Sequence, residues 1–195
     1  VGGGPLHDLG IYCLNAVRQL FDAEPEEAFA WKATRKEPRF ADSYEMLSAM
    51  LRFPKERLAT FTASNGAADA GWYELVGTKG SICLGPAYEY AGELEMEVTI
   101  GGRSRTTKFA RRDQFAPELL HFSDSILERR QPEPSGREGL ADVRVIAALL
   151  ESAERGRPVR LPPYEAASGP GMDQEMRLPP VRKPDLVEVQ QPHPS

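Results

Sequence analysis

Glu93-Leu94-Glu95-Met96-Glu97-Val98-Thr99-Ile100, followed by Gly101-Gly102 and by Arg103 to Phe109, is the stretch that decides the fold. Apolar and polar residues alternate along its first eight positions, a period that is typical of a strand with one buried face. The two glycines predict a two-residue hairpin turn, because glycine readily adopts the positive φ angles that such turns need. The returning strand is then antiparallel, and Glu95 faces Lys108 across the pair.

Further strands are expected upstream of this hairpin. A second hairpin is predicted from Trp72 to Leu84, with its turn at Thr78-Lys79-Gly80. Earlier stretches have the same alternation, which predicts at least six strands in all. Those stretches contain Phe29, Trp31 and Ala33; then Leu47, Ala49, Leu51 and Phe53; and then Leu58 to Ser64.

Helices are predicted on both sides of the strands. The first runs from about Pro5 to Phe21, and two more follow the last strand. The final helix opens with a capping box, in which Ser135 and Glu138 satisfy each other's backbone donors. The expected apolar stripes are Leu6, Leu9, Cys13, Val17, Leu20 and Phe21 in the first helix, Phe115, Leu119, Phe122 and Ile126 in the second, and Leu140, Val143, Ala147 and Leu150 in the third.

This order of elements predicts an α+β domain over residues 1–162, with a predominantly antiparallel or mixed sheet and helices packed on one face. Residues 163–195 are rich in proline and are expected to form an extended tail. The other face of the sheet carries enough apolar residues to be covered as well, which favours a homodimer or homotetramer. Candidates for that interface are Trp31, Met46, Met50 and Phe61.

Composition excludes several classes of partner. The net charge of -5 argues against nucleic acid, since binding phosphates needs a basic face. No apolar run approaches the roughly 20 residues of a membrane span, so no membrane partner is expected. No cysteine and histidine spacing resembles a zinc site, and no metal is expected. We expect a cytoplasmic protein.

The first helix carries a second, polar stripe. At 100° per residue, Asp8, Tyr12, Asn15 and Gln19 fall within a narrow arc opposite the apolar face. A carboxylate and a phenol four residues apart can hold two hydroxyls of one ligand, or position one proton. The alternative is an ordinary solvated face. Gly10 interrupts the helix and marks the close approach of another backbone or a ligand.

These residues form a motif. The pattern Gly2-Gly3-Gly4-x-x-x-Asp8-x-Gly10-x-Tyr12 resembles the signature that opens the second domain of the glucose-fructose oxidoreductase/inositol dehydrogenase family (Gfo/Idh/MocA). The resemblance covers about residues 1–162 and continues through Tyr73 to Ser81, Phe115 to Leu120 and Gly139 to Val143. Many members have His at the last position of the signature. Tyr12 instead matches the branch of glucose-fructose oxidoreductase, dihydrodiol dehydrogenase and xylose dehydrogenase.

The resemblance implies an oxidoreductase that moves a hydride between NAD or NADP and a CH–OH group of a sugar, polyol or diol. It implies that Tyr12 is the acid/base and that Asp8 orients a substrate hydroxyl. A free phenol has a pKa of about 10, so it needs a nearby cation, which the family supplies from a Lys of its upstream Rossmann domain. Asn15 is expected to contact another hydroxyl, His7 to support the site, and Gly4 to allow at most a close approach of the cofactor.

The chain begins at Val1 in mid-motif, so we expect a fragment that lacks its cofactor-binding domain and is inactive alone. The alternative is a non-catalytic dimerisation or binding module that keeps the fold. Asp8 and Tyr12 favour the enzyme, whereas the missing domain favours the module for this chain.

Overall fold

The structure, a computed structural model, describes residues 3–88, 92–165 and 171–180. These fall into two compact units, which we treat separately. The first unit comprises Val1–Ala70 and Arg129–Gln174, and the second comprises Gly71–Glu128 and Glu175–Ser195. Gly2 of the signature and most of the proline-rich segment lie outside the described residues. The division of the chain at residue 162 stays a prediction.

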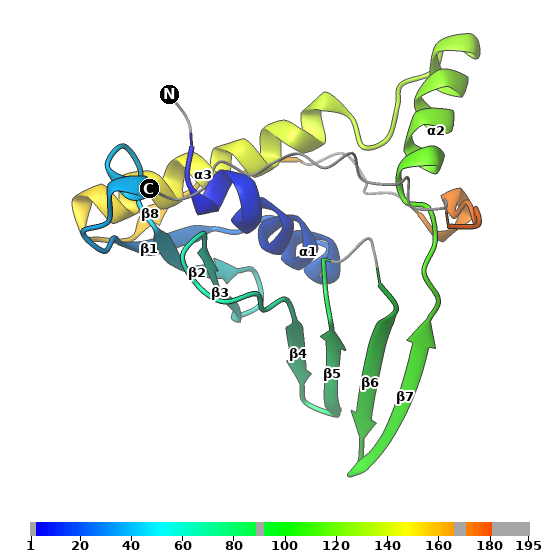
Figure 1. Ribbon diagram of the computed structural model, residues 1–195, viewed down its shortest axis with the longest axis horizontal. Helices are drawn as coiled ribbons and strands as arrows, with labels where there is room; N and C mark the ends of the chain where they lie inside the picture. The colour runs from blue at the N-terminus through cyan, green and yellow to red at the C-terminus, as the bar shows by residue number, and fades with distance from the viewer. Residues whose placement is uncertain (1–2, 89–91, 166–170, 181–195) are drawn as a thin grey trace. The chain divides into compact units, whose positions relative to one another are not determined.

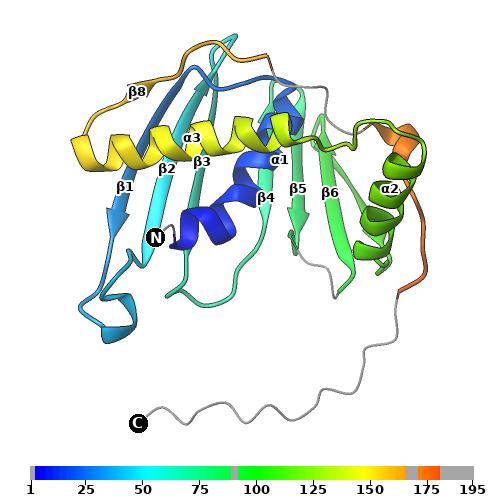
Figure 2. The ribbon, with the colours of Figure 1, turned by 90° about the horizontal axis from the view of Figure 1, so that it is seen from above.

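The first unit is a sheet with two helices on one face (Figures 1 and 2). Its four strands lie in the order β3-β2-β1-β8, and all are antiparallel. Helices α1 and α3 lie on the same side of this sheet in both views. The elements are a π-helical turn at Leu6–Gly10, α1 at Ile11–Phe21, β1 at Glu27–Ala33, a 3₁₀ turn at Pro38–Phe40, β2 at Met46–Phe53, β3 at Arg57–Ser64, α3 at Gly136–Arg155, β8 at Val159–Arg160 and a 3₁₀ turn at Met172–Gln174.

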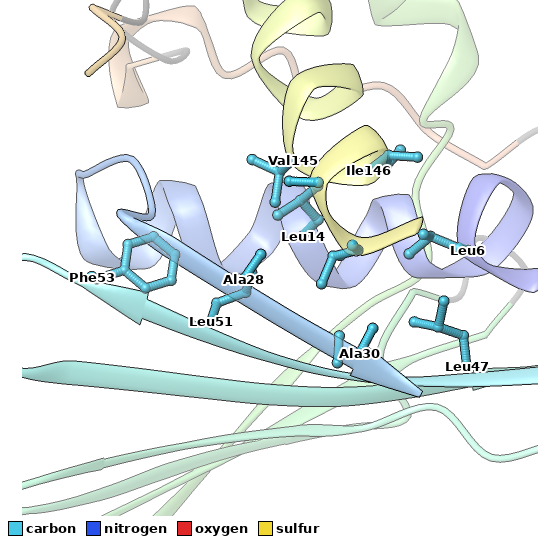
Figure 3. Close-up of a cluster of buried hydrophobic side chains, with 12 residues drawn as sticks. Leu6, Leu14, Ala28, Ala30, Leu47, Leu51, Phe53, Val145 and Ile146 are labelled. Atoms are coloured by element: carbon cyan, nitrogen blue, oxygen red, sulfur yellow. The ribbon is translucent and has the colours of Figure 1, made fainter. Parts of the chain in front are cut away.

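The core lies between this sheet and the two helices (Figure 3). Alternate residues of β2 are buried, as its sequence predicts, and β1 contributes the small side chains of Ala28 and Ala30. Their size lets α3 pack closely over β1. Ser152 of α3 reinforces this contact, because its hydroxyl accepts a hydrogen bond from the Ala30 N–H at 3.2 Å. Phe29 and Trp31 lie on the opposite face and meet edge to face at 5.2 Å.

The apolar stripe predicted for the first helix is wrong at several positions. Leu9 and Leu20 are exposed, whereas the buried residues follow one line at intervals of four: Leu6, Gly10, Leu14 and Arg18. The π-helical turn explains part of the difference, since its i→i+5 bonds widen the turn and shift the phase of the residues before it. The rest of the difference comes from Arg18. This residue is buried, although its charge led to the prediction that it lies outside the core.

The stripe predicted for α3 is also wrong. Leu140 and Val143 are exposed. The side of α3 that faces the core includes two polar residues. Apolar spacing alone therefore does not identify it. Its members are Ala141, Asp142, Val145, Ile146, Ala148, Leu149 and Ser152. Phe61 is likewise on the core side of its sheet, against Gly10, and so not on the open face.

The second unit is a four-stranded antiparallel sheet in the order β4-β5-β6-β7, with one helix. Its elements are β4 at Tyr73–Gly77, β5 at Gly80–Gly85, β6 at Leu94–Ile100, β7 at Arg103–Phe109 and α2 at Phe115–Leu127. Both predicted hairpins are confirmed. Glu95 pairs with Lys108 at 3.4 Å, and Gly101 and Gly102 have φ angles of 56° and 76°. The four apolar residues predicted as a stripe on α2 are all exposed.

The predicted α+β class and element order are therefore confirmed, although the strands form two sheets.

Gly10 predicts a measurable stability change. A Cβ added there would lie 2.9 Å from Leu6 Cδ1 and 3.2 Å from Phe61 Cε2. Leu6 is fully buried, so its side chain can give way only by disturbing the core around it. Overpacking destabilises by about 1–3 kcal/mol, which exceeds the gain of about 1 kcal/mol from replacing glycine in a helix. Gly10→Ala should lower the melting temperature.

Gly139→Ala is the matched control, because a Cβ there meets nothing within 4 Å. It should leave the melting temperature unchanged or raise it. A Gly10→Ala protein that melts above the wild type would contradict the close packing of this helix on β3.

Candidate active site

Gly4 lies just before the helix that carries the signature. The carbonyl of Gly4 accepts hydrogen bonds from the N–H groups of His7 at 3.1 Å and Asp8 at 3.3 Å. Its φ is +107°, and an added Cβ would lie 2.8 Å from Cζ of Tyr44. Glycine is thus required by the backbone and by the Tyr44 ring. A role for Gly4 beside a cofactor stays a prediction.

The predicted site residues share the exposed side of this helix. His7 and Asp8 lie in the π-helical turn, and Tyr12 and Asn15 lie in α1. All four are exposed, and Tyr12 is 58% exposed. In the wide π-helical turn, residues four apart lie closer to one line along the helix axis than they do in an α-helix. Asp8 therefore lies on the same side of the helix as Tyr12. The structure thus places a carboxylate and a phenol together on the exposed side of the helix.

The buried side of α1 is fixed by an ion cluster around Arg18, which is 4% exposed. Its guanidinium binds Glu24, just beyond the helix, at 2.6 Å, and reaches two carboxylates of α3. Nη1 lies 2.9 Å from Glu138 and 2.5 Å from Asp142. Burial alone would lower the pKa of Arg18, but the hydrogen bonds and charges of Glu24 and Asp142 outweigh it and raise that pKa above its ordinary value.

Asp142 joins this cluster to the exposed side of α1. One of its oxygens, Oδ1, accepts from Arg18, and the other, Oδ2, accepts from the side-chain amide of Asn15 at 3.3 Å. A single buried carboxylate therefore contacts both a core residue and a predicted site residue of α1.

Sequence reasoning missed the whole Arg18 cluster. One signal in the sequence could have indicated it. Arg18 follows Leu14 by four residues, and so continues the line of Leu6, Gly10 and Leu14 along the helix. The capping box was half correct: the Ser135 hydroxyl accepts from the Glu138 N–H at 3.4 Å. The Glu138 carboxylate pairs with Arg18 instead of capping the helix start.

The described residues also bear on other kinds of site. No group of three or more His, Cys, Asp or Glu side chains that could hold a metal ion is found among them. Nor does any helix in the described ranges have the length and apolar character to cross a membrane.

Comparison with known proteins decides the family. The model of the C-terminal alpha/beta domain of the Gfo/Idh/MocA oxidoreductase family matches residues 1–161. The chain belongs to this family. The match includes the signature helix, both hairpins and α3, so the resemblance of the sequence motifs is confirmed across both units.

Several members of the family are similar to this chain. D-xylose 1-dehydrogenase [NADP(+)] of Haloarcula marismortui is 31% identical over 161 residues, which are 82% of this chain and 44% of that protein. Trans-1,2-dihydrobenzene-1,2-diol dehydrogenase of Xenopus tropicalis is 24% identical, over 78% of this chain and 46% of that protein. The crystal structure of aldose-aldose oxidoreductase from Caulobacter crescentus, complexed with glycerol, is 35% identical with a TM-score of 0.75, over 83% of this chain and 48% of that one. The chain therefore spans about half the length of these relatives.

Arg18 predicts a large loss of stability on substitution. Arg18→Met keeps the length of the side chain but leaves Glu24, Glu138 and Asp142 without their shared cation. Removing one partner of a buried ion pair costs about 3–5 kcal/mol, so the free energy of unfolding should fall by that amount. Urea denaturation followed by circular dichroism measures it.

Arg155→Met is the control. Arg155 pairs with Glu151 on the surface of α3, with a side chain 55% exposed. Such exposed pairs contribute less than about 1 kcal/mol. Equal losses in the two variants would contradict a special role for the buried cluster.

Proposed function

We propose that the complete protein is a nicotinamide-dependent oxidoreductase acting on a CH–OH group of a sugar, polyol or diol. This chain supplies the substrate side of the active site. The observation that carries the proposal is the exposure of Asp8 and Tyr12 on one side of a helix whose other side is fixed by the core and the Arg18 cluster. The activities of the similar proteins, whose names include an aldose and a diol as substrates, support it.

The chemistry of the site follows from the two exposed side chains, Asp8 and Tyr12. Tyr12 takes the proton of the reacting hydroxyl as that group becomes a carbonyl, and returns it in the reverse reaction. Asp8 accepts a hydrogen bond from a substrate hydroxyl and so orients the sugar beside Tyr12. A free phenol loses its proton near pH 10, so a cation must stand beside Tyr12 for this step to run near neutrality.

The described residues fit the substrate side of such a reaction. They offer an acceptor and a proton-transfer group on one surface, and no G-x-G-x-x-G turn for phosphates occurs in the sequence. When bound, NAD or NADP takes or returns the hydride of the reacting carbon. The cofactor binds mainly to a domain outside this chain, and the chain alone is inactive. His7 lies beside Asp8 in the same exposed turn and supports the site.

Tyr12→Phe tests the catalytic assignment in the complete protein. The ring stays, so packing and the helix change little, and only the transferable proton is lost. Acid/base catalysis typically contributes about 10²- to 10⁴-fold, so kcat for D-xylose with NADP⁺ should fall by that order while KM changes little. Steady-state kinetics, with a thermal melt to check folding, measures this.

Gln19→Glu is the control, since Gln19 lies on the same exposed side, nearly two turns further along the helix. It should leave kcat close to the wild-type value. A Tyr12→Phe enzyme with normal kcat and melting temperature would show that Tyr12 belongs to a solvated face.

The chain also forms a homo-oligomer through the open face of the first unit's sheet. Helices cover one face of that sheet, while Trp31, Met50 and Leu58 are exposed on strands of the other. Burying such a patch against its own copy removes apolar surface from water with one repeated contact. Met46 is half-buried on the same face and belongs to the proposed interface.

Met50→Glu should therefore convert the oligomer to monomers in analytical ultracentrifugation, because a charge in the centre of an apolar interface is left without a partner. Leu140→Glu is matched in exposure, since both residues are 50% exposed, but it lies on α3 at the opposite face. It should leave the mass unchanged. A wild-type protein that stays monomeric at high concentration would contradict the proposal.

A further inference from the structure

Asn15 is held in one orientation by Asp142. The amide nitrogen of Asn15 lies 3.3 Å from Asp142 Oδ2, and the other oxygen of this buried carboxylate binds Arg18. An ionised carboxylate can only accept hydrogen bonds, so the amide must turn its NH₂ group to Asp142. With the amide reversed, two oxygens would face each other. The side-chain carbonyl of Asn15 therefore points away from Asp142.

This orientation bears on what Asn15 can recognise. Asn15 is exposed and lies one turn beyond Tyr12 on the same side of α1. A free asparagine side chain can donate or accept, and so distinguishes poorly between groups that donate and groups that only accept. The contact with Asp142 restricts that freedom, because it holds one of the two N–H donors and leaves the carbonyl oxygen turned away from the carboxylate.

We propose that Asn15 is a specificity-determining residue that accepts a hydrogen bond from a second, non-reacting hydroxyl of the substrate, and that Asp142 is the positioning residue that fixes it as an acceptor. The inference rests on the proposed function and narrows it. The substrate is a polyhydroxylated molecule with a donating hydroxyl near the reacting one, so a simple alcohol or an ether at that position is a poor substrate.

Two effects of Asp142 must be separated. Through Arg18 it stabilises the packing of α1 on α3, and through Asn15 it sets the chemistry of recognition. A purely structural role predicts that Asp142 variants lose stability and bind all sugars more weakly in the same proportion. The positioning role predicts a change in the ratio between sugars that differ at a single hydroxyl.

The first experiment observes the amide directly, by nuclear magnetic resonance of the protein labelled with ¹⁵N at asparagine. The signals of the Asn15 side-chain NH₂ group should move in Asp142→Asn and stay in place in Asp42→Asn, a variant of an exposed loop residue. Asn15 signals that do not respond to Asp142→Asn would overturn the orientation, whatever the enzyme does.

The second experiment uses the complete protein with NADP⁺, D-xylose and its mono-O-methyl ethers. An ether oxygen accepts but cannot donate, so methylation of the recognised hydroxyl should lower kcat/KM about tenfold, mainly through KM. To separate this loss from the bulk of the methyl group, the same ether is tested on Asp142→Asn. There the amide is free to turn and donate, and the penalty should shrink.

Exchanging the side chains of Asn15 and Asp142 tests whether substrate recognition can be restored. Asn15→Asp alone places two carboxylates together and should weaken binding. Combined with Asp142→Asn, it keeps the net charge, because the amide at 142 now donates to the carboxylate at 15, which still accepts from the substrate. The double variant should regain most of the binding and the ether penalty.

The outcomes distinguish the two proposals. If no sugar is turned over and Tyr12→Phe changes nothing, the proposed function fails, while the amide signals still report whether Asp142 holds Asn15. If sugars are turned over but every ether penalty is the same in the wild type and in Asp142→Asn, Asn15 is not a fixed acceptor and this inference is wrong.

Discussion

The buried guanidinium of Arg18 is the interaction on which the arrangement of the first unit depends. It joins α1, the loop that follows it and α3 through three carboxylates. A buried cation is tolerated only when its donors are satisfied, so the ends of Glu24, Glu138 and Asp142 must meet at one place. That requirement fixes the rotation of α1 about its own axis, which apolar packing alone would specify less sharply. The exposed side of α1 is then also fixed, and it carries the signature residues.

Two local features of the helix serve this geometry. Gly10 lets the π-helical turn lie directly against Phe61 and Ala63 of β3. The wide turn keeps Leu6, Gly10, Leu14 and Arg18 on one buried line, while Asp8 and Tyr12 stay exposed. A π-helical turn is less favourable than an α-helical one and is often found at functional sites, in keeping with its place here in the signature.

The sequence predicted the strands better than the helices. The side chains of a strand alternate with a period of two, so the alternation of β2 and β6 can be seen directly in the sequence. Gly101 and Gly102 also fix the register of the β6–β7 hairpin. The helical stripes failed because the buried sides of α1 and α3 contain Arg18, Asp142 and Ser152, whose partners come from distant parts of the chain. No local pattern shows that an arginine and an aspartate 124 positions apart will meet. For the same reason the motif indicated Asp8 and Tyr12, but not the cluster that orients them.

The central claim is that Tyr12 exchanges a proton with the substrate. A crystal structure of the complete protein with a nicotinamide cofactor and a bound sugar tests it most directly. We expect the phenol oxygen of Tyr12 about 2.6–3.2 Å from the oxygen on the sugar carbon that faces the nicotinamide. A complex in which Tyr12 points into solvent, with another side chain against that oxygen, would contradict the account.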